Sequence, residues 1–488
     1  MKLFPIMGGI HPEHRKDLTS EKAIVAMPMP ATLFLPLQQH IGEPAAPTVE
    51  AGYLVKKGEL LARSDGAISA PIHAPTSGRI RAIAEITAPH PSGLPMPTII
   101  LESDGKDEWT DLPPPIDDPF AAPPQSIRDR VAECGIVGMG GATFPSAVKL
   151  GLGTQRKLEV LLLNGAECEP YLTCDDRLMR EYADEVIDGA RIMAHALGAP
   201  RVIVAIETNK PQAIEAMAKA AAATDNVTIA KVPARYPMGG ERQLTQAVTG
   251  LETPARKLTA DMGVVVHNVA TARAVHDAVR LGRPLISRIV TVSGGAVPNP
   301  GNIEVPLGVK VSELLAFCGG ADGAARFVSG GPMMGQPLPS LDVPVVKGSS
   351  GILALTRAET RESEPQPCIR CGSCIAACPC GLVPMQMAAF IRAEKMAEAV
   401  RIGVQDCVSC GSCTYVCPSH IPLVQYFRYA KGRLATQDRE RRKNEQTKAL
   451  VEARNARLER LAMARRDAAA RARAPQPETA QEAGRIAP

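Results

Sequence analysis

Cysteines near the C-terminal end of the chain are the residues best suited to chemistry. The chain has 13 cysteines, and nine of them lie between Cys368 and Cys417. Among these nine, the pattern C-x2-C-x2-C-x3-C-P occurs twice, beginning at Cys368 and at Cys407. Three thiolates at this spacing can wrap one face of an iron–sulfur cubane, and the fourth, which precedes a proline, ligates the other cubane. The spacing therefore predicts two 4Fe–4S clusters.

The crossed arrangement assigns each thiol to a cluster. We expect cluster 1 to be held by Cys368, Cys371, Cys374 and Cys417, and cluster 2 by Cys378, Cys407, Cys410 and Cys413. Gly372 and Gly411 would let the backbone approach the sulfides. A pair of structural zinc sites is the alternative, but zinc usually takes C-x2-C pairs separated by longer loops. Cys380 fits neither quartet, and we interpret it as structural.

Helical patterns flank the two cysteine motifs. Apolar residues, several of them methionines, recur at helical spacing over Pro384–Gly403, and Leu423–Leu434 shows the same period. We interpret these methionines as core residues. The motifs therefore indicate a helical two-cluster ferredoxin domain.

Composition limits the classes of function for the whole chain. The 488 residues carry a formal charge of only +4, and aromatic residues make up 3% of the total. Neither value favours binding to nucleic acid. No secretory signal is visible at the N-terminus, and no apolar run reaches the ~18 residues that a spanning helix needs. We expect a protein of the cytosol, or one docked on the cytosolic face of a membrane.

Short apolar stretches separated by Gly and Pro predict an all-β module over about residues 30–110. The stretches Glu50–Glu59 and Ala74–Ile80 resemble the barrel-sandwich hybrid of biotinyl and lipoyl domains. A carrier domain of that kind needs a lysine at a hairpin tip, and the corresponding stretch Ser69–Pro75 has none. We therefore interpret this module as structural. A proline-rich linker follows at residues 113–125.

Strand and helix patterns alternate over residues 126–284, which predicts an α/β domain with a largely parallel sheet. We expect strands at Leu158–Leu163 and Arg201–Ile206, and helices at Leu178–Leu197 and Pro211–Ala223. Residues 285–345 return to short strands, with a short helix expected within Leu307–Leu315.

Two loops of the α/β domain have ligand-binding composition. The first, Gly135–Pro145, is dense in glycine, and such loops expose N–H groups that can bind phosphate. The second follows the expected strand at Leu158–Leu163 and carries Glu167 and Glu169. It would lie at the carboxyl edge of the sheet, where open α/β sheets bind ligands. Taken alone, these acids are also compatible with a solvated loop.

Several stretches of the chain resemble the flavin- and NADH-binding subunit of respiratory complex I. They are Gly138–Leu150, Asn164–Pro170, Tyr236–Glu241, His267–Thr271 and Val305–Gly308. The order of modules is more specific, because a barrel-sandwich start containing Leu35–Gly42 precedes the flavin-like domain and a two-cluster ferredoxin follows it. This order resembles the RnfC subunit of Rnf ion-translocating electron transport complexes.

The resemblance implies sites for FMN and NADH. The family's binding residues correspond to Gly138, Gly140, Gly141, Lys149, Asn164, Glu167, Glu241, Asn268 and Thr271. The chain departs from the complex I pattern at Ala166 and Gly240, each of which stands where that family has a carboxylate. Thr143 and Cys168 stand where it has glycine.

These observations predict a multidomain α/β protein. The expected parts are a barrel-sandwich hybrid at 1–112, a proline-rich linker at 113–125, an FMN/NADH-binding α/β domain at 126–284, a β-grasp (SLBB-like) module at 285–345, a ferredoxin domain with two 4Fe–4S clusters at 346–430, and a basic helical or disordered tail at 431–488. The tail is rich in arginine, and we expect either a solvated helix or a basic arm that contacts anionic lipid or an acidic partner.

The resemblance further implies an electron-input subunit of an ion-translocating oxidoreductase at the cytosolic face of the bacterial inner membrane. Electrons would pass between NADH, FMN and the clusters to membrane subunits, with ferredoxin a further expected partner and no nucleic acid involved. A soluble NADH-oxidising flavoprotein of another redox enzyme is one alternative. A ferredoxin-type carrier without enzymatic activity is another.

Overall fold

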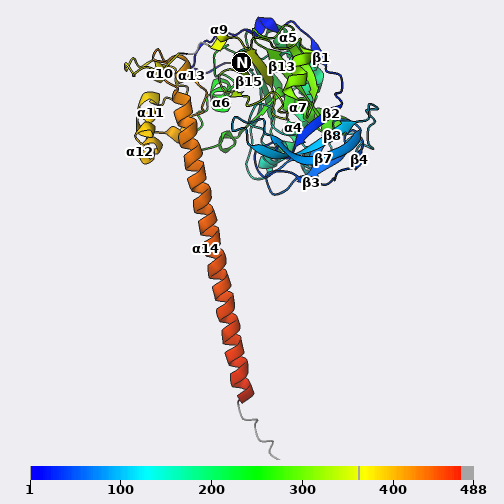
Figure 1. Ribbon diagram of the computed structural model, residues 1–488, viewed down its shortest axis with the longest axis vertical. Coiled ribbons are helices and arrows are strands. Elements are labelled where there is room, and N and C mark those ends of the chain that lie inside the picture. The colour runs from blue at the N-terminus through cyan, green and yellow to red at the C-terminus, as the bar shows by residue number, and fades with distance from the viewer. Residues whose placement is uncertain (1, 361–362, 474–488) are drawn as a thin grey trace, which may run out of the picture. The chain divides into compact units, whose positions relative to one another are not determined.

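The computed structural model describes residues 2–360 and 363–473 (Figure 1). The chain divides into two compact units, residues 1–427 and 428–488, which we describe separately. The first unit contains all the sheets, and in the described part of the second unit the chain is a single helix.

A four-stranded parallel sheet organises the α/β domain. Its strand order is β11-β10-β9-β12, with β9 at Val160–Gly165, β10 at Arg201–Glu207, β11 at Val227–Val232 and β12 at Val264–Asn268. β9 and β12 are almost wholly buried, as expected of parallel strands covered by helices on both faces. Because the strands are parallel, the loops after β9 and β12 meet at one carboxyl edge.

Helices cover both faces of this sheet. They are α1 (Pro124–Glu133), α2 (Ser146–Leu150), α3 (Cys174–Glu181), α4 (Ala183–Leu197), α5 (Pro211–Ala221), α6 (Glu241–Thr249) and α7 (Val269–Leu281), with 3-10 turns η2 (Gly151–Thr154) and η3 (Thr259–Met262). The helix expected over Leu178–Leu197 is divided into α3 and α4 at Tyr182, whose ψ of 38° is not helical. The Tyr182 ring packs against the guanidinium of Arg273 in α7, which lies 3.7 Å from the ring centroid.

The β-grasp module is built on a six-stranded mixed sheet that draws on distant parts of the chain. Its order is β1-β14-β13-β17-β15-β16, with β1 at Ile24–Ala26, β13 at Ser287–Ser293, β14 at Gly301–Pro306, β15 at Arg326–Ser329, β16 at Gln336–Pro337 and β17 at Gly351–Leu355. The short helix α8 spans Val311–Phe317, and α9 spans Arg357–Thr360. β1 pairs with β14, and β17 lies centrally, beside β13. Residues 24–26 and 351–355 therefore extend this module beyond the expected range 285–345.

The barrel-sandwich module consists of two antiparallel sheets. The orders are β2-β8-β7-β4 and β3-β5-β6, with β2 at Thr32–Pro36, β3 at Ala46–Pro47, β4 at Leu54–Val55, β5 at Leu60–Arg63, β6 at Ile72–His73, β7 at Gly78–Thr87 and β8 at Pro95–Ser103. The segment that corresponds to a carrier's hairpin tip is buried at residues 70–78. The Pro71 carbonyl accepts a hydrogen bond from Lys347 Nζ at 2.7 Å. This packing fits a structural module.

The residues before β1 do not belong to the barrel-sandwich. Residues 16–18 form a 3-10 turn, η1 (Lys16–Leu18), and Leu3 and Ile6 pack against the α6 side of the parallel sheet. The Phe4 backbone N–H donates to the carbonyl of Ala247 in α6. The first residues of the chain thus bind to the α/β domain.

Short helices surround the cysteine motifs. They are α10 (Ser373–Ala376), α11 (Pro384–Arg392), α12 (Met396–Arg401) and α13 (Ser412–Tyr415), with the 3-10 turn η4 at Val404–Asp406. One glycine follows the second cysteine of each motif. These glycines, Gly372 before α10 and Gly411 before α13, both have φ of 80°. This left-handed conformation favours glycine, and both motifs share it. Met387 and Ile391 of α11 are buried, as expected for core residues.

The helix α14 runs from Leu423 to Arg473 and forms the described part of the second unit from Arg428 onward. Among the described residues, no helix is both long enough and apolar enough to cross a bilayer.

Close packing of α4 against α7 positions the carboxyl edge of the sheet. A Cβ at Gly189 in α4 would lie 1.9 Å from the carbonyl oxygen of Ala272 in α7. We therefore expect Gly189→Ala to separate the two helices and to lower the free energy of unfolding by about 1–3 kcal/mol, despite alanine's higher helix propensity. Thermal unfolding followed by circular dichroism would measure the loss.

The matched control is Gly432→Ala, also within a helix, where an added Cβ meets nothing within 4 Å. It should leave the unfolding temperature unchanged or raise it slightly. Equal effects of the two substitutions would contradict the packing argument.

Candidate cofactor sites

The glycine loop lies against the beginning of α7. The Met139 N–H, between Gly138 and Gly140, donates to Thr271 Oγ1 at 2.9 Å. A Cβ at Gly140 would be 3.4 Å from the Cβ of Asn268, whereas one at Gly141 would meet nothing within 4 Å. The loop therefore presents open backbone beside the N-terminus of a 13-residue helix. Such a helix end attracts anionic groups such as phosphate.

Asn268 joins α7 to the loop after β9. Its Oδ1 accepts from the Ala270 N–H at 2.8 Å and so caps α7, and its Nδ2 donates to Asp175 Oδ2 at 2.6 Å. Asn164, at the end of β9, donates from Nδ2 to the Gly239 carbonyl at 2.8 Å. The two asparagines thus connect the ends of β9 and β12 to neighbouring loops.

Lys149 and Glu241 face one another at the same edge. Lys149 Nζ lies 3.6 Å from Glu241 Oε2 and donates to the Val266 carbonyl of β12. Glu241 begins α6, and its Oε1 accepts from Thr259 Oγ1 at 2.6 Å. The structure thus brings the glycine loop, Lys149, Asn164, Glu241, Asn268 and Thr271 to the carboxyl ends of β9 and β12.

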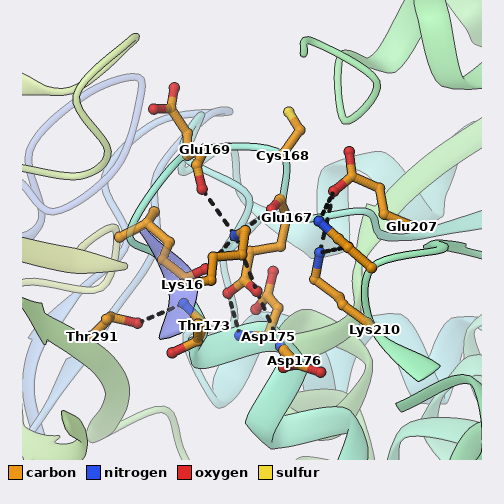
Figure 2. A network of polar contacts seen from close by, with 12 residues as sticks. Lys16, Glu167, Cys168, Glu169, Thr173, Asp175, Asp176, Glu207, Lys210 and Thr291 are labelled. Atoms are coloured by element: carbon orange, nitrogen blue, oxygen red, sulfur yellow. Dashed lines mark hydrogen bonds and ion pairs between the residues drawn. The ribbon is translucent and has the colours of Figure 1, made fainter. Parts of the chain in front are cut away.

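Residues 166–172 follow β9, and we call them the β9 loop. Two lysine side chains bind four of its backbone carbonyls (Figure 2). Lys16 Nζ donates to the carbonyls of Glu167 at 2.8 Å and Glu169 at 2.9 Å, and also to that of Leu172. Lys210 Nζ donates to the Ala166 carbonyl at 2.6 Å and lies 3.2 Å from Glu207 Oε2. The Lys210 side chain is 1% exposed and that of Lys16 is 12% exposed. Desolvation lowers the pKa of Lys16, partly offset by Glu167.

The carboxylate of Glu167 faces the protein rather than the edge of the sheet. Its oxygens accept the N–H groups of Asp175 at 2.7 Å and Asp176 at 3.3 Å, at the start of α3. Burial, together with the neighbouring Glu167, raises the pKa of Asp175 to about 7. The Glu167 side chain therefore positions α3.

Glu169 lies where three modules meet. Its carboxylate accepts the N–H groups of Met333 at 3.0 Å and Met334 at 2.9 Å, which lie between β15 and β16 of the β-grasp sheet. The Tyr236 hydroxyl lies 3.4 Å from Glu169 Oε1 and donates to the Cys410 carbonyl at 2.6 Å. A buried tyrosine, 2% exposed, thus connects the β9 loop to a cysteine of the second motif.

The N-terminal residues contact the first cysteine motif. The Gly9 N–H donates to the Ala377 carbonyl at 3.0 Å, and Ile10 pairs with Tyr236. A Cβ at Gly8, whose φ is 56°, would lie 2.3 Å from the carbonyl oxygen of Cys378. Only glycine fits this approach without displacement of backbone.

The cysteines assigned to cluster 2 surround one cavity. Its lining includes Cys378 of the first motif together with Cys407, Cys410 and Cys413 of the second. Cys380 also lines this cavity, and Gln243 Nε2 of α6 contacts its Sγ at 4.0 Å. The fourth cysteine of the first motif thus lies among the first three of the second, and four thiolates around one cavity fit a cubane.

The cysteines assigned to cluster 1 are more accessible. Cys368 and Cys371 are exposed, Cys374 is buried and Cys417 is half-buried. Residues after Cys417 return to the first motif, since the Gln366 N–H donates to the Ser419 carbonyl and Ser419 Oγ donates to the Pro367 carbonyl. This pairing places the end of the second motif beside the start of the first.

A cavity of about 460 Å³ lies beside these sites without including their candidate residues. Its lining includes Trp109, Asp175, Arg273 and Arg288. None of the nine residues implied by the flavin resemblance lines it. Asp175 connects the cavity to the β9 loop, because its N–H donates to the Glu167 carboxylate.

Several residues that organise the sites gave no signal in the sequence. Lys16 lies far along the chain from the residues that it binds and belongs to no ligand motif. Tyr236 begins a stretch that resembles the complex I subunit, but that resemblance did not indicate its contact with Cys410. Glu169 and Lys210 could have been suspected only as charges near a strand end. At Thr143, where the complex I pattern has glycine, the backbone keeps a left-handed conformation, with φ of 47°, that favours glycine.

Four family models match the chain in order. They are the RnfC barrel sandwich hybrid domain at residues 4–106, the Nuo51 FMN-binding domain at 131–277, the SLBB domain at 289–337 and the 4Fe-4S dicluster domain at 367–421. These models and the arrangement of the sites define a flavin- and iron–sulfur-containing electron-transfer protein with FMN and 4Fe–4S clusters as cofactors. The predicted fold class and cofactors are confirmed.

The curated relatives are more specific. The chain is 57% identical to the C subunit of the ion-translocating oxidoreductase complex of Rhodobacter capsulatus over 447 residues, 91% of this chain and 86% of the relative. It is 47% identical to the Pseudomonas aeruginosa protein of the same name, covering 93% of this chain and 58% of that one. It is 45% identical to the C subunit of the "Proton-translocating ferredoxin:NAD(+) oxidoreductase complex" of Clostridium ljungdahlii, covering 87% of this chain and 93% of the relative. The chain belongs to the RnfC family of ion-translocating oxidoreductase subunits.

One solved structure with partial likeness is an NAD+-reducing [NiFe]-hydrogenase in the H2-reduced state. It is 21% identical, with a TM-score of 0.45, and the match covers 63% of this chain and 60% of that one.

The contacts of Lys16 predict a large effect of its removal. Lys16→Met would leave three backbone carbonyls of the β9 loop without their donor, and we expect a loss of about 2–4 kcal/mol in the free energy of unfolding. Denaturant unfolding followed by circular dichroism would measure it. The control, Lys22→Met, removes one contact of an exposed lysine with the Pro300 carbonyl and should change stability by about 0.5 kcal/mol or less. Similar losses in both variants would contradict this role of Lys16.

The raised pKa of Asp175 predicts that the stability of the protein depends on pH. With its pKa raised to about 7, the folded protein binds a proton more tightly than the unfolded chain, so the contribution of Asp175 to stability is lost as pH rises toward 7. Asp175→Asn, which can still accept from Asn268, should flatten the unfolding temperature between about pH 4 and about pH 7. The exposed Asp129→Asn is the control and should leave the pH profile unchanged. Parallel profiles for all three proteins would show that Asp175 does not titrate in this range.

Proposed function

We propose that this chain is the electron-input subunit of an ion-translocating oxidoreductase complex, and that it exchanges electrons with NADH through FMN and the two 4Fe–4S clusters. The observation that carries the proposal is the direct packing of the FMN-binding domain on the cluster 2 cysteines, through Tyr236 and Cys410. FMN exchanges a hydride with a nicotinamide and passes electrons singly to clusters.

The residues at the carboxyl edge of the parallel sheet have separate roles in this proposal. The backbone of Gly138, Gly140 and Gly141 and the N-terminus of α7 would bind the FMN phosphate, as glycine loops and helix ends do. Asn268 and Thr271 would hold the loop and helix in register through the Ala270 and Met139 N–H groups. Asn164, Lys149 and Glu241 line the same edge, where they would orient the flavin ring and the nicotinamide.

The departures from the complex I pattern fit this arrangement. Ala166 lacks a carboxylate, but its carbonyl is bound by Lys210, whose charge is balanced by Glu207. Cys168, which replaces a glycine, accepts the Gly239 N–H at its Sγ at 3.3 Å. Burial raises the pKa of the Cys168 thiol, so this sulfur acts as a neutral acceptor. The β9 loop and the loop before α6 therefore remain joined.

The surroundings of the cysteines give a direction to electron transfer within the chain. Four contacts connect the region of Cys378 and Cys410 to the N-terminal residues, to the loop before α6, to α6 and to the turn after it. They are made by Gly9, Tyr236, Gln243 and Arg256, in that order. Cys368 and Cys371 are exposed instead. We infer that cluster 2 lies nearer the flavin and that cluster 1 faces the next carrier.

The complex would lie at the cytosolic face of the bacterial inner membrane, where NADH is available. Its other subunits would take electrons from cluster 1. Ferredoxin would be a further redox partner, as the name of the Clostridium relative suggests. The exposed thiols at Cys368 and Cys371 fit such a docking surface better than the buried cluster 2 cysteines do.

NADH titration of the anaerobically purified full chain tests the function directly. We expect bleaching of the flavin absorbance, followed by cluster signals in low-temperature electron paramagnetic resonance. Flavin that is present but not reduced by NADH would contradict the NADH-linked role. Clusters that remain oxidised while the flavin is reduced would contradict the internal path.

Single-cysteine variants test the order of the clusters. Cys371→Ala should remove cluster 1 and about half of the bound iron, while NADH still reduces cluster 2. Cys410→Ala should remove cluster 2, so that NADH reduces the flavin but no longer reduces cluster 1 at a comparable rate. Cys380→Ala is the control and should keep both clusters. The reverse result for Cys371→Ala and Cys410→Ala would overturn the order, and loss of a cluster in Cys380→Ala would overturn the ligand assignment.

A further inference from the structure

The residues of α14 are exposed along most of its length. Every described residue from Arg439 to Arg473 is exposed, including Leu450 at 72% and Leu461 at 48%. An uncovered helix normally distributes its charges around all sides. Charges surround α14 too, but one broad side of it carries cations and no acid.

Most acidic residues of α14 lie along one side, and Glu440 lies beyond the edge of the other. Asp438, Glu445, Glu452 and Glu459 are seven residues apart, which is close to two helical turns, so they form one line. Two cations on this side are paired, since Arg441 contacts Asp438 at 2.9 Å and Lys448 lies 4.0 Å from Glu452. Intrahelical ion pairs therefore neutralise much of the charge on this side.

The other side of the helix carries unpaired basic residues. At about 100° per residue, an arc of about 140° between Arg439 and Arg473 contains eight cations and no acid. The eight are Arg439, Arg442, Lys443, Arg454, Arg457, Arg460, Arg465 and Arg471. We call them, with Leu450 and Leu461 between them, the basic face. None of the eight forms an ion pair with another described residue.

We propose that the basic face of α14 binds an anionic lipid bilayer. It extends over about 50 Å at 1.5 Å per residue, which suits a flat surface. Arginine and leucine side chains on one side of a helix suit the headgroup region, where the cations contact lipid phosphates and the leucines enter the acyl boundary. An acidic protein partner fits less well, because the leucines are too few and too far apart to form the apolar centre of a protein interface.

The inference adds a membrane contact that the family assignment does not include. Subunits of an ion-translocating complex work at a membrane, and the described helices supply no span. Each cation near an anionic surface strengthens binding about fivefold, and salt screens the attraction. Eight cations on one face are therefore enough for reversible docking.

Two quadruple variants with the same change in charge test the role of the face. The first, Arg442→Gln/Arg454→Gln/Arg457→Gln/Arg465→Gln, removes cations from the basic face. The second, Arg441→Gln/Lys448→Gln/Arg466→Gln/Arg473→Gln, removes the same number from the other side of α14. Glutamine keeps helix propensity close to that of arginine, and circular dichroism would verify the helix content. Binding of the full, cluster-loaded chain is measured by co-sedimentation with phosphatidylcholine vesicles, with and without phosphatidylglycerol.

We expect the unmodified chain to bind only the phosphatidylglycerol vesicles and to dissociate as salt is raised. The first variant should bind at least about tenfold more weakly, and the second should stay within about threefold of the unmodified chain. Equal loss in both variants would overturn the proposal, as would failure of the unmodified chain to bind. Binding to soluble polyglutamate that competes fully with the vesicles would indicate an acidic protein partner instead. NADH-dependent dye reduction should be equal in all three proteins, which separates this test from that of the proposed function.

Discussion

The arrangement of both redox sites depends on the carbonyls of the β9 loop, which are bound by two lysine side chains. Lys16 and Lys210 donate to four carbonyls between Ala166 and Leu172. Backbone carbonyls that turn inward need buried donors, and an ammonium group with three donors can satisfy several of them at once. Desolvation of two cations opposes this arrangement, and the nearby carboxylates of Glu167 and Glu207 offset it. The loop is thereby fixed at the edge where an open α/β sheet binds its ligand.

Because the β9 loop is fixed, it can also position the clusters. Glu169 extends from it to the N–H groups of Met333 and Met334, and Tyr236 extends from the neighbouring loop to Cys410. Three modules that are separate in sequence thus share one junction. A buried junction with satisfied polar groups has one arrangement rather than several, since separating it would leave the Glu169 carboxylate and the Cys410 carbonyl without donors. A fixed distance between the flavin-binding domain and cluster 2 follows from this packing.

Prediction from sequence succeeded where the determining interactions are local. The cysteine motifs, Gly372 and Gly411 specify cluster geometry within a few residues, and the buried apolar strand at Val160–Gly165 specifies the sheet. Long-range pairing was not predictable. Lys16 finds its partners about 150 residues away, and nothing near it in sequence distinguishes it from a surface lysine. At the break between α3 and α4, Tyr182 likewise contacts a distant residue, Arg273 in α7. The flavin residues could be placed only through resemblance, since glycine loops and single acids have many uses.

The barrel-sandwich module illustrates how a fold can keep its architecture while its functional tip becomes a packing surface. A carrier exposes this tip and modifies a lysine there, whereas here the Pro71 carbonyl is bound by Lys347. The second partner of Lys347 Nζ is the Gly135 carbonyl, at 2.7 Å, at the start of the glycine-rich segment. Complete burial lowers the pKa of Lys347 to about 7, so much of its population is uncharged at neutral pH. The lysine thus joins the module to the glycine-rich segment at a reduced cost of desolvation. The module therefore supports the glycine-rich segment through Lys347, while Lys16 binds the β9 loop.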